Sequence, residues 1–532
     1  MQTESELQEQ VQKRRTFAII SHPDAGKTTL TEKLLLYSGM IHTAGMVRGR
    51  KGSKAATSDW MAMEQERGIS ITSSAMQFSY KDTIINILDT PGHQDFSEDT
   101  YRTLTAADCA IMVIDAAKGV EKQTRKLFEV CRLRQIPVLT FINKMDMPGR
   151  EPLELMNEVE NLLQIHSSPI NWPIGTGKSF VGVYDRIAKE CLIFIKTSVG
   201  GSKKVDIERY PLGHPHLETL IDKEYISQLE QELELLEIAG NPFSKQEFLE
   251  GSVTPVFFAS ALTNFGVEPF FDAFIKYAPS PGPRIATKTD GEDMLIDPIK
   301  NTFSAYVFKI QANMDKRHRD SMAFLRVCSG KFEKDLVVKH HRLKREIRLS
   351  RPHGMLSGER TTVETGYAGD IIGVINPGMF SIGDTLSLSG GFNFKPLPQF
   401  QPEIFAKVSP KDISKRKSFD KGVVQLAEEG AIQVLFPYES YGDVVFGAVG
   451  QLQFEVMQYR LKDEYGVEVL STPLPYKCSA WLIGDPSSFE KGSTSLIVKD
   501  RSERVMVLFN SPWEKEYVIK NNPRHQLVDY MA

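Results

Sequence analysis

The chain has 532 residues, of which 41% are hydrophobic and 25% are charged. This composition excludes a disordered or fibrous protein, and the length predicts about three or four domains. Lys and Arg number 64 and Asp and Glu number 68, so the formal net charge is −4. The overall charge therefore does not attract nucleic acid, and any RNA contact must come from local basic patches.

Neither a membrane span nor an export signal is expected. No window approaches the roughly 18 apolar residues of a membrane helix, and the first 15 residues are polar. The cysteines are scattered without a CxxC pair, at Cys109, Cys131, Cys191, Cys328 and Cys478. This pattern predicts reduced thiols in the cytoplasm, without a disulfide framework or a zinc site.

Residues 16–147 alternate between buried strands and helices. A strand over 16–20 precedes a helical segment over 28–39, and three more strands are expected over 83–89, 109–117 and 136–143. Strands that alternate with helices predict a mainly parallel sheet with helices on both faces.

The pattern changes between about 150 and 250, where 225–240 is a charged amphipathic helix. Residues 254–262 then resemble one more strand of the first sheet, which predicts an insertion within the first domain. The segment 279–284, PSPGPR, holds three prolines and predicts a stiff linker. The first domain is therefore expected to cover 1–280.

Two further domains are expected after this linker. Short strands with glycine punctuation predict a small antiparallel β-barrel over 285–398. A strand at 431–436, a helix at 450–466 and a strand at 467–470 predict an α+β domain of the split βαβ type over 402–532.

The segment SHPDAGKTT (21–29) lies between the first strand and the first helix. A phosphate-binding P-loop needs backbone N–H groups, a lysine for the β- and γ-phosphates and a hydroxyl for Mg²⁺. Lys27 and Thr28 fit the last two roles, and Gly26 allows a close approach. Ser21 stands where the strict pattern has glycine, so an ordinary strand-to-helix turn is the alternative.

A second segment, WPIGTGKS (172–179), also ends in GKS. Neither a buried strand before it nor a helix after it is expected. Because a P-loop needs this strand–loop–helix context, we predict a loop without a phosphate role.

The segment DTPGH (89–93) directly follows the strand that ends near residue 88. Asp89 can hold Mg²⁺ through water, the Gly92 N–H can meet a γ-phosphate, and His93 can orient the attacking water. A lone DTPG is otherwise a turn.

The segment NKMD (143–146) ends the next strand. The Asp146 carboxylate can accept hydrogen bonds from N1 and N2 of guanine, a pairing that adenine cannot match. Asn143 can connect this loop to the P-loop, and the Lys144 stem can cover the base. SAL (260–262) can offer a backbone N–H to the guanine carbonyl.

The segment ERGISIT (66–72) lies where a switch should be, and a hydroxyl there could complete the Mg²⁺ shell when a γ-phosphate is present. The motifs occur in order at the carboxyl ends of strands, where α/β sheets bind ligands. They predict an α/β P-loop GTPase domain.

The motifs RGIS (67–70), DTPGH, NKMD and SAL resemble those of the translational GTPases. The P-loop and the segments 58–74, 89–109, 308–320, 425–434 and 447–469 are similar to the bacterial class II peptide chain release factors, over nearly the whole chain. Ser70 stands where most translational GTPases have threonine.

The resemblance implies a role for each motif residue. The phosphate set is Asp24, Ala25, Gly26, Lys27, Thr28, Thr29 and Gly92, and the guanine set is Asn143, Lys144, Asp146, Ser260, Ala261 and Leu262. Mg²⁺ would contact Thr28, Ser70 and, through water, Asp89, while His93 would be catalytic.

The family resemblance implies a ribosome-stimulated GTPase that uses GTP, GDP and Mg²⁺. It would act as a monomer on the ribosome and promote departure of the class I release factor after peptide release. A translocase-like or ribosome-protecting GTPase is one alternative, and a nucleotide-gated binding module with incidental hydrolysis is another.

Two basic runs, 339–351 and 411–421, are candidates for contact with ribosomal RNA. Either could instead be a solvated hairpin face or loop.

Overall fold

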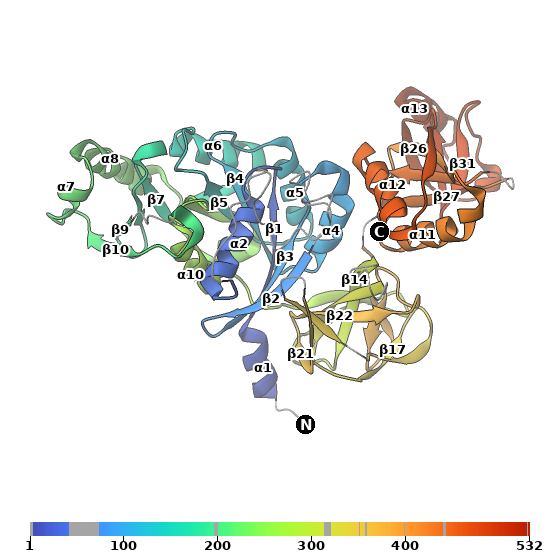
Figure 1. Ribbon diagram of the computed structural model, residues 1–532, viewed down its shortest axis with the longest axis horizontal. Coiled ribbons are helices and arrows are strands. Elements are labelled where there is room, and N and C mark those ends of the chain that lie inside the picture. Colours follow the sequence, from blue (N-terminus) through green and yellow to red (C-terminus); the bar gives the residue numbers. More distant parts are fainter. Residues whose placement is uncertain are drawn as a thin grey trace.

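The computed structural model describes residues 4–41, 74–195, 200–312, 321–350, 352–356, 359–397, 399–439, 443–528 and 530–531. The predicted switch segment 66–72, with Ser70, lies outside these residues. Figure 1 shows the amino-terminal sheet between an inserted sheet on the left and two further groups of elements on the right.

The first sheet has the strand order β2-β3-β1-β4-β5-β11-β6. Every neighbouring pair is parallel except β2 with β3. This confirms the predicted mainly parallel sheet. Its strands are β1 (Arg14–Ser21), β2 (Ser74–Tyr80), β3 (Thr83–Asp89), β4 (Cys109–Asp115), β5 (Val138–Asn143), β6 (His166–Pro169) and β11 (Val253–Phe258).

Helices cover both faces of this sheet because its strands are apolar on both sides. Phe17 and Ile19 of β1 pack in one core with Leu34, whereas Ala18 and Ile20 pack in another with Leu127. The first core involves α2 (Lys27–Ser38) and α10 (Val267–Tyr277), and the second involves α4 (Ser97–Thr105), α5 (Lys122–Leu133) and α6 (Pro152–Leu163). Two more helices, α1 (Glu4–Gln12) and α9 (Lys245–Glu250), complete this region.

The inserted elements form an antiparallel sheet in the order β10-β9-β8-β7. Trp172 and Phe258 bring this sheet and the first sheet into a shared core. The elements are β7 (Asn171–Ile174), β8 (Gly182–Asp185), β9 (Glu190–Phe194), β10 (Ile207–Pro211), α7 (Leu217–Leu220) and α8 (Lys223–Ala239), with short turns η2 (Gly177–Ser179) and η3 (Gly200–Ser202).

The next group is antiparallel throughout and encloses one core that includes Phe303, Leu325 and Leu386. This confirms the predicted β-barrel. The strands are β12 (Arg284–Lys288), β13 (Asp293–Ile296), β14 (Ser304–Ala312), β15 (Ser321–Ser329), β16 (Lys331–Glu333), β17 (Val337–His340), β18 (Arg345–Arg348), β19 (His353–Leu356), β20 (Glu359–Thr362), β21 (Thr365–Tyr367), β22 (Ile371–Asn376), β23 (Thr385–Ser387) and β24 (Phe392–Phe394).

The last group is one antiparallel sheet in the order β29-β26-β28-β27-β31-β32-β30-β33. Helix α11 connects β26 to β27 across β28, and α12 connects β28 to β29 across β26, which confirms the split βαβ type. The elements are β26 (Ile404–Pro410), η4 (Ile413–Lys415), α11 (Arg416–Glu428), β27 (Gln433–Pro437), β28 (Val445–Ala448), α12 (Gln451–Tyr465), β29 (Val469–Pro473), β30 (Cys478–Ile483), η5 (Pro486–Ser488), β31 (Leu496–Lys499), β32 (Val505–Phe509), α13 (Pro512–Asn521) and β33 (Gln526–Val528), beside a short pair of β25 (Gln399–Phe400) and β34 (Tyr530–Met531).

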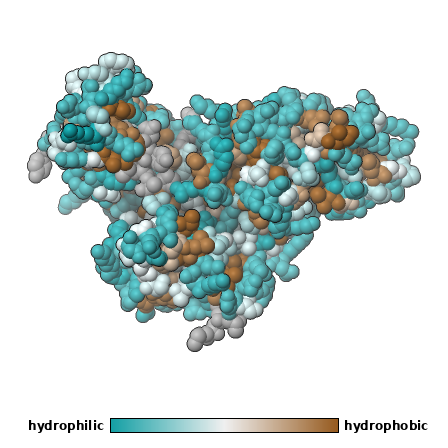
Figure 2. All heavy atoms as spheres, turned by 180° about the vertical axis from the view of Figure 1, so that it is seen from behind, coloured by the Kyte–Doolittle hydropathy of each residue, from teal (hydrophilic) through white to brown (hydrophobic). Residues whose placement is uncertain are grey.

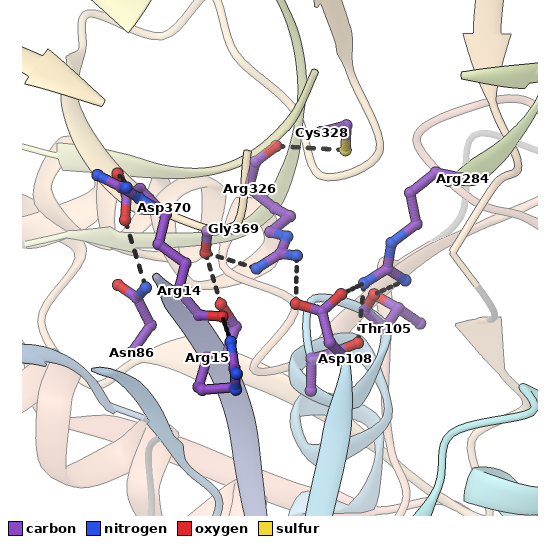
Figure 3. A network of polar contacts seen from close by, with 12 residues as sticks. Arg14, Arg15, Asn86, Thr105, Asp108, Arg284, Arg326, Cys328, Gly369 and Asp370 are labelled. Carbon is purple, nitrogen blue, oxygen red and sulfur yellow. Dashed lines mark hydrogen bonds and ion pairs between the residues drawn. The ribbon is translucent and has the colours of Figure 1, made fainter. Parts of the chain in front are cut away.

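Three arginines, of which Arg14 and Arg326 are buried, join the first sheet to the barrel (Figure 3). Arg14 of β1 pairs with Asp370 at 2.9 Å. Arg326 of β15 and Arg284 of β12 both reach Asp108, at 2.6 Å and 2.8 Å. Since removing one partner of a buried pair leaves an uncompensated charge, these pairs hold the two groups in one arrangement.

The rear face of the molecule is mainly hydrophilic, with hydrophobic residues in small separate groups (Figure 2). Within the described ranges, no helix is both long and apolar enough to cross a membrane. All five cysteines are free thiols, and burial raises the pKa of Cys131 to about 12. A thiol with so high a pKa is rarely a thiolate and therefore reacts slowly.

The boundaries expected at 280, 285–398 and 402–532 stay predictions.

Candidate functional site

The predicted P-loop connects β1 to α2 in a strained turn. Asp24 has φ 66° and Gly26, the residue before α2, has φ 98°. Glycine is required at position 26 because a Cβ there would overlap the side-chain amide of Asn143. The free N–H groups of the first turn of α2 therefore open onto the loop, which is the arrangement that binds phosphate.

Lys27 is buried, and its ammonium pairs with the carboxylate of Asp89 at the end of β3. The P-loop and DTPGH are thus brought together, although 62 residues separate the two side chains. Gly92 also lies close to the P-loop: a Cβ at position 92 would be 3.5 Å from the backbone of Pro23. Phosphates bound at the loop would therefore lie between the lysine and the DTPGH segment.

Asn143 joins three of the predicted segments. Its side-chain amide donates to the carbonyl of Ala25 at 2.8 Å, and its side-chain oxygen accepts the N–H of Ala261 at 2.9 Å. The P-loop, NKMD and SAL are therefore held together by one buried side chain. Ser260 is fully buried and accepts the Thr263 N–H at 3.2 Å, which fixes the turn that begins at SAL.

An unused acceptor lies beside this junction. The Asp146 Oδ1 atom is buried and has no hydrogen-bond partner among the residues that the structure describes. A buried carboxylate oxygen without a donor is costly unless a ligand supplies one. Guanine presents N–H groups of this kind, so the residues present fit a guanine base.

Asp115 is a residue that the sequence reasoning did not single out. It ends β4, is buried, and accepts from the Lys144 ammonium at 2.7 Å. The backbone of Lys144 is left-handed, with φ 69°, and the ion pair holds its side chain against Asp115. The signal was present, because Asp115 also stands at the carboxyl end of a buried strand.

His93 is partly exposed, with 36% of its side chain accessible. Its Nδ1 atom accepts the backbone N–H of Asp95 at 3.3 Å. The same Nδ1 atom also lies 3.3 Å from the Oδ1 carboxylate oxygen of Asp95. The remaining site residues lie in the same loops: Asp24 is exposed, Thr28 and Thr29 are partly exposed, and Ala25 is buried.

The GTGKS segment forms the turn η2, and a strand rather than a helix follows it, as expected. The expectation that no buried strand precedes it was wrong, because the buried strand β7 leads into it. The Gly177 N–H donates to the carbonyl of Met145 at 2.8 Å. The segment thus contacts the NKMD loop, which the sequence did not suggest.

Of the basic runs, 339–351 is largely the β17–β18 hairpin, where His340 is buried and Arg342 pairs with Asp384 at 2.6 Å. The run 411–421 covers η4 and the first turns of α11, and it is mostly exposed. Ile413 at its tip is 85% exposed.

Lys33 lies in α2, the helix that follows the P-loop. Its side chain is buried, and burial lowers the pKa of its ammonium from 10.5 to about 8. Between these values the unfolded chain binds a proton that the folded chain has lost, so unfolding becomes harder as pH rises. Lys33→Met loses both the buried charge and the hydrogen bond to the Gly201 carbonyl, but only the charge depends on pH. We therefore expect the thermal midpoint of the unchanged protein to rise relative to that of Lys33→Met between pH 7.5 and pH 9.5. A difference independent of pH would contradict the buried charge.

Three family models match the chain. They are the Elongation factor Tu GTP binding domain over 12–280, Elongation factor G domain 2 over 302–389, and the Class II release factor RF3, C-terminal domain over 394–519. A solved structure from Thermus thermophilus shares the fold, with TM-score 0.69 and 21% identity over 92% of this chain and 72% of that chain.

Relatives of nearly full length carry a common name. Peptide chain release factor 3 of Gloeobacter violaceus is 53% identical, with 98% of each chain covered. The protein of the same name in Symbiobacterium thermophilum is 51% identical, with 97% of each chain covered. With the P-loop, DTPGH and NKMD in place, the chain belongs to the peptide chain release factor 3 family and is a translation-termination GTPase.

Proposed function

We propose that this GTPase promotes departure of the class I release factor from the ribosome after peptide release, and then hydrolyses GTP to GDP and phosphate. The observation that carries the proposal lies beside His93. Two residues further on, the Asp95 carboxylate accepts the N–H of Leu452, the second residue of α12, at 2.8 Å. A segment that would respond to the γ-phosphate therefore touches the last domain directly.

Two more contacts follow along α4. Arg102 donates to the carbonyl of Glu429 at 3.4 Å, and the ring of Tyr101 lies 4.3 Å from that of Phe400. A shift of the DTPGH segment would move all of these contacts together. GTP binding can in this way change the position of the last domain, which is the change of shape needed to displace a neighbouring factor.

The nucleotide would be held by the loops described above. The P-loop, with the Gly92 N–H, would bind the phosphates, and Asp146, with the SAL backbone, would read guanine. Thr28 and Asp89 offer the oxygen atoms that Mg²⁺ prefers, and Mg²⁺ would neutralise charge on the phosphates. Ser70 would complete its shell.

Hydrolysis would depend on His93. A histidine that orients water must point at the γ-phosphate, and contact with the ribosome would supply that placement. Intrinsic turnover should therefore be slow. Ribosomal RNA would meet the exposed run 411–421, since phosphate contacts need accessible basic side chains. The protein would act in the cytoplasm as a monomer.

The contact of α12 with Asp95 can be tested with one substitution. A Cβ at Gly450 would overlap the Asp95 carboxylate. We expect Gly450→Ala to slow factor departure about tenfold, the effect of losing roughly 1.4 kcal/mol of docking, while GTP affinity stays unchanged. Gly282→Ala is the matched control, because a Cβ there meets nothing within 4 Å. Equal departure rates for the two variants would contradict the coupling.

The function itself is tested by turnover. A class I factor would be supplied at a tenth of the ribosome concentration, and peptide release would be counted with this protein plus GTP or plus GDP. We expect several rounds per factor with GTP and about one without it. One round under both conditions would reject the proposal, and a non-hydrolysable analogue would show whether hydrolysis itself is needed.

A further inference from the structure

The inserted sheet touches both loops that would read the base. Its turn η2 reaches the NKMD loop through the Gly177 N–H, which donates to Met145 between Lys144 and Asp146. The turn is itself fixed to α8, because the Tyr225 hydroxyl donates to Ser179 at 2.7 Å. The position of Asp146 is therefore supported from the insertion.

A second segment of the insertion, residues 200–205, reaches the loop that begins at SAL. Asn264 is 1% exposed, and its side-chain amide donates to the carbonyls of Gly201 at 2.9 Å and Lys203 at 2.5 Å. A Cβ at Gly201 would overlap the carbonyl oxygen of Leu262. Only glycine allows the two backbones to approach this closely.

The same segment also holds α2, whose first turn forms the phosphate end of the site. The ammonium of Lys33 donates to the Gly201 carbonyl, and that of Lys204 donates to the Tyr37 carbonyl at 2.9 Å. Residues 200–205 thus link the base loop to the phosphate helix.

We propose that the inserted region, through η2 and residues 200–205, holds the guanine-binding loops in position and thereby sets how long a nucleotide stays bound. These contacts are called the clamp below. The inference rests on the proposed guanine role of Asn143, Asp146 and the SAL segment. The clamp acts on the loops that would contact the base and on α2, whose first turn faces the phosphates. GDP and GTP share the base and the first two phosphates. Loosening it should therefore speed the departure of both nucleotides equally, whereas a loss at the γ-phosphate would affect GTP alone.

The test compares variants within the clamp. Gly201→Ala and Asn264→Ala each disrupt one or two hydrogen bonds, so we expect roughly tenfold faster dissociation of fluorescent GDP and of a fluorescent GTP analogue. The ratio of the GDP dissociation rate to that of the GTP analogue should stay as in the unchanged protein. Ile187→Ala, on an exposed turn of the same sheet, and Gly282→Ala are the controls and should stay within about twofold of it.

Folding and site assignment are separated from the clamp by two further measurements. Tyr225→Phe removes one hydroxyl and should speed dissociation of both nucleotides about threefold, which keeps the test valid if Gly201→Ala does not fold. Clamp variants with normal dissociation would overturn the clamp. If nucleotides dissociate normally from the clamp variants while Asp146→Asn loses affinity for guanine nucleotides, the guanine site is correct and only the clamp is wrong. If Asp146→Asn also keeps its affinity for guanine nucleotides, the guanine site itself is assigned to the wrong residues.

Discussion

Replacing Asp146 with Asn should lower the affinity for GDP and GTP by about a thousandfold, because two hydrogen bonds to a carboxylate contribute roughly 1.5–3 kcal/mol each. The buried Oδ1 of Asp146 has no other partner in the described part of the chain. An amide in its place would turn one acceptor into a donor facing the N–H groups of guanine. Equilibrium titration with fluorescent nucleotides measures the loss.

The same variant should gain affinity for xanthine nucleotides, since xanthine has a carbonyl where guanine has an amino group. Asp82→Asn is the matched control, because Asp82 is exposed at the turn between β2 and β3. If guanine affinity survives in Asp146→Asn, or if xanthine gains nothing, the guanine site has been placed on the wrong residues.

Replacing His93 with Ala should reduce ribosome-stimulated GTP hydrolysis by at least about a hundredfold, the usual effect of removing one positioned catalytic group. GTP and GDP binding should remain, because His93 lies outside the loops proposed to hold the base and its side chain is partly exposed. Single-turnover hydrolysis at saturating ribosomes separates the chemical step from binding.

A control for this variant is His214→Ala, at an exposed position of the inserted region. Its hydrolysis should match that of the unchanged protein. Unaltered turnover in His93→Ala would remove His93 from the mechanism and leave another group to orient the water.

The sequence predicted which side chains lie close together where those side chains follow strand ends. The carboxyl ends of parallel strands meet at one edge, so Lys27, Asp89 and Asn143 could be placed together from their order alone. Asp115 carried the same signal, but its role depends on Lys144, which adopts a left-handed backbone that no local pattern predicts.

Contacts between segments far apart in the chain could not be predicted from the sequence. Leu452 meets Asp95 across 357 residues, and Asn264 meets Gly201 across 63. Such pairs depend on how whole domains pack, while periodicity reports only local structure. Likewise, β30 to β33 went unpredicted. These short strands pair with one another, and only β31 pairs with β27.

In the proposed function, GTP drives departure of the class I release factor from the ribosome. The most direct measurement is the dissociation rate of a labelled class I factor from post-release ribosomes, with this protein and either GTP or no nucleotide. We expect a large acceleration with GTP and none without it. No acceleration, together with normal ribosome-stimulated hydrolysis, would contradict it and would place this GTPase at another step of translation.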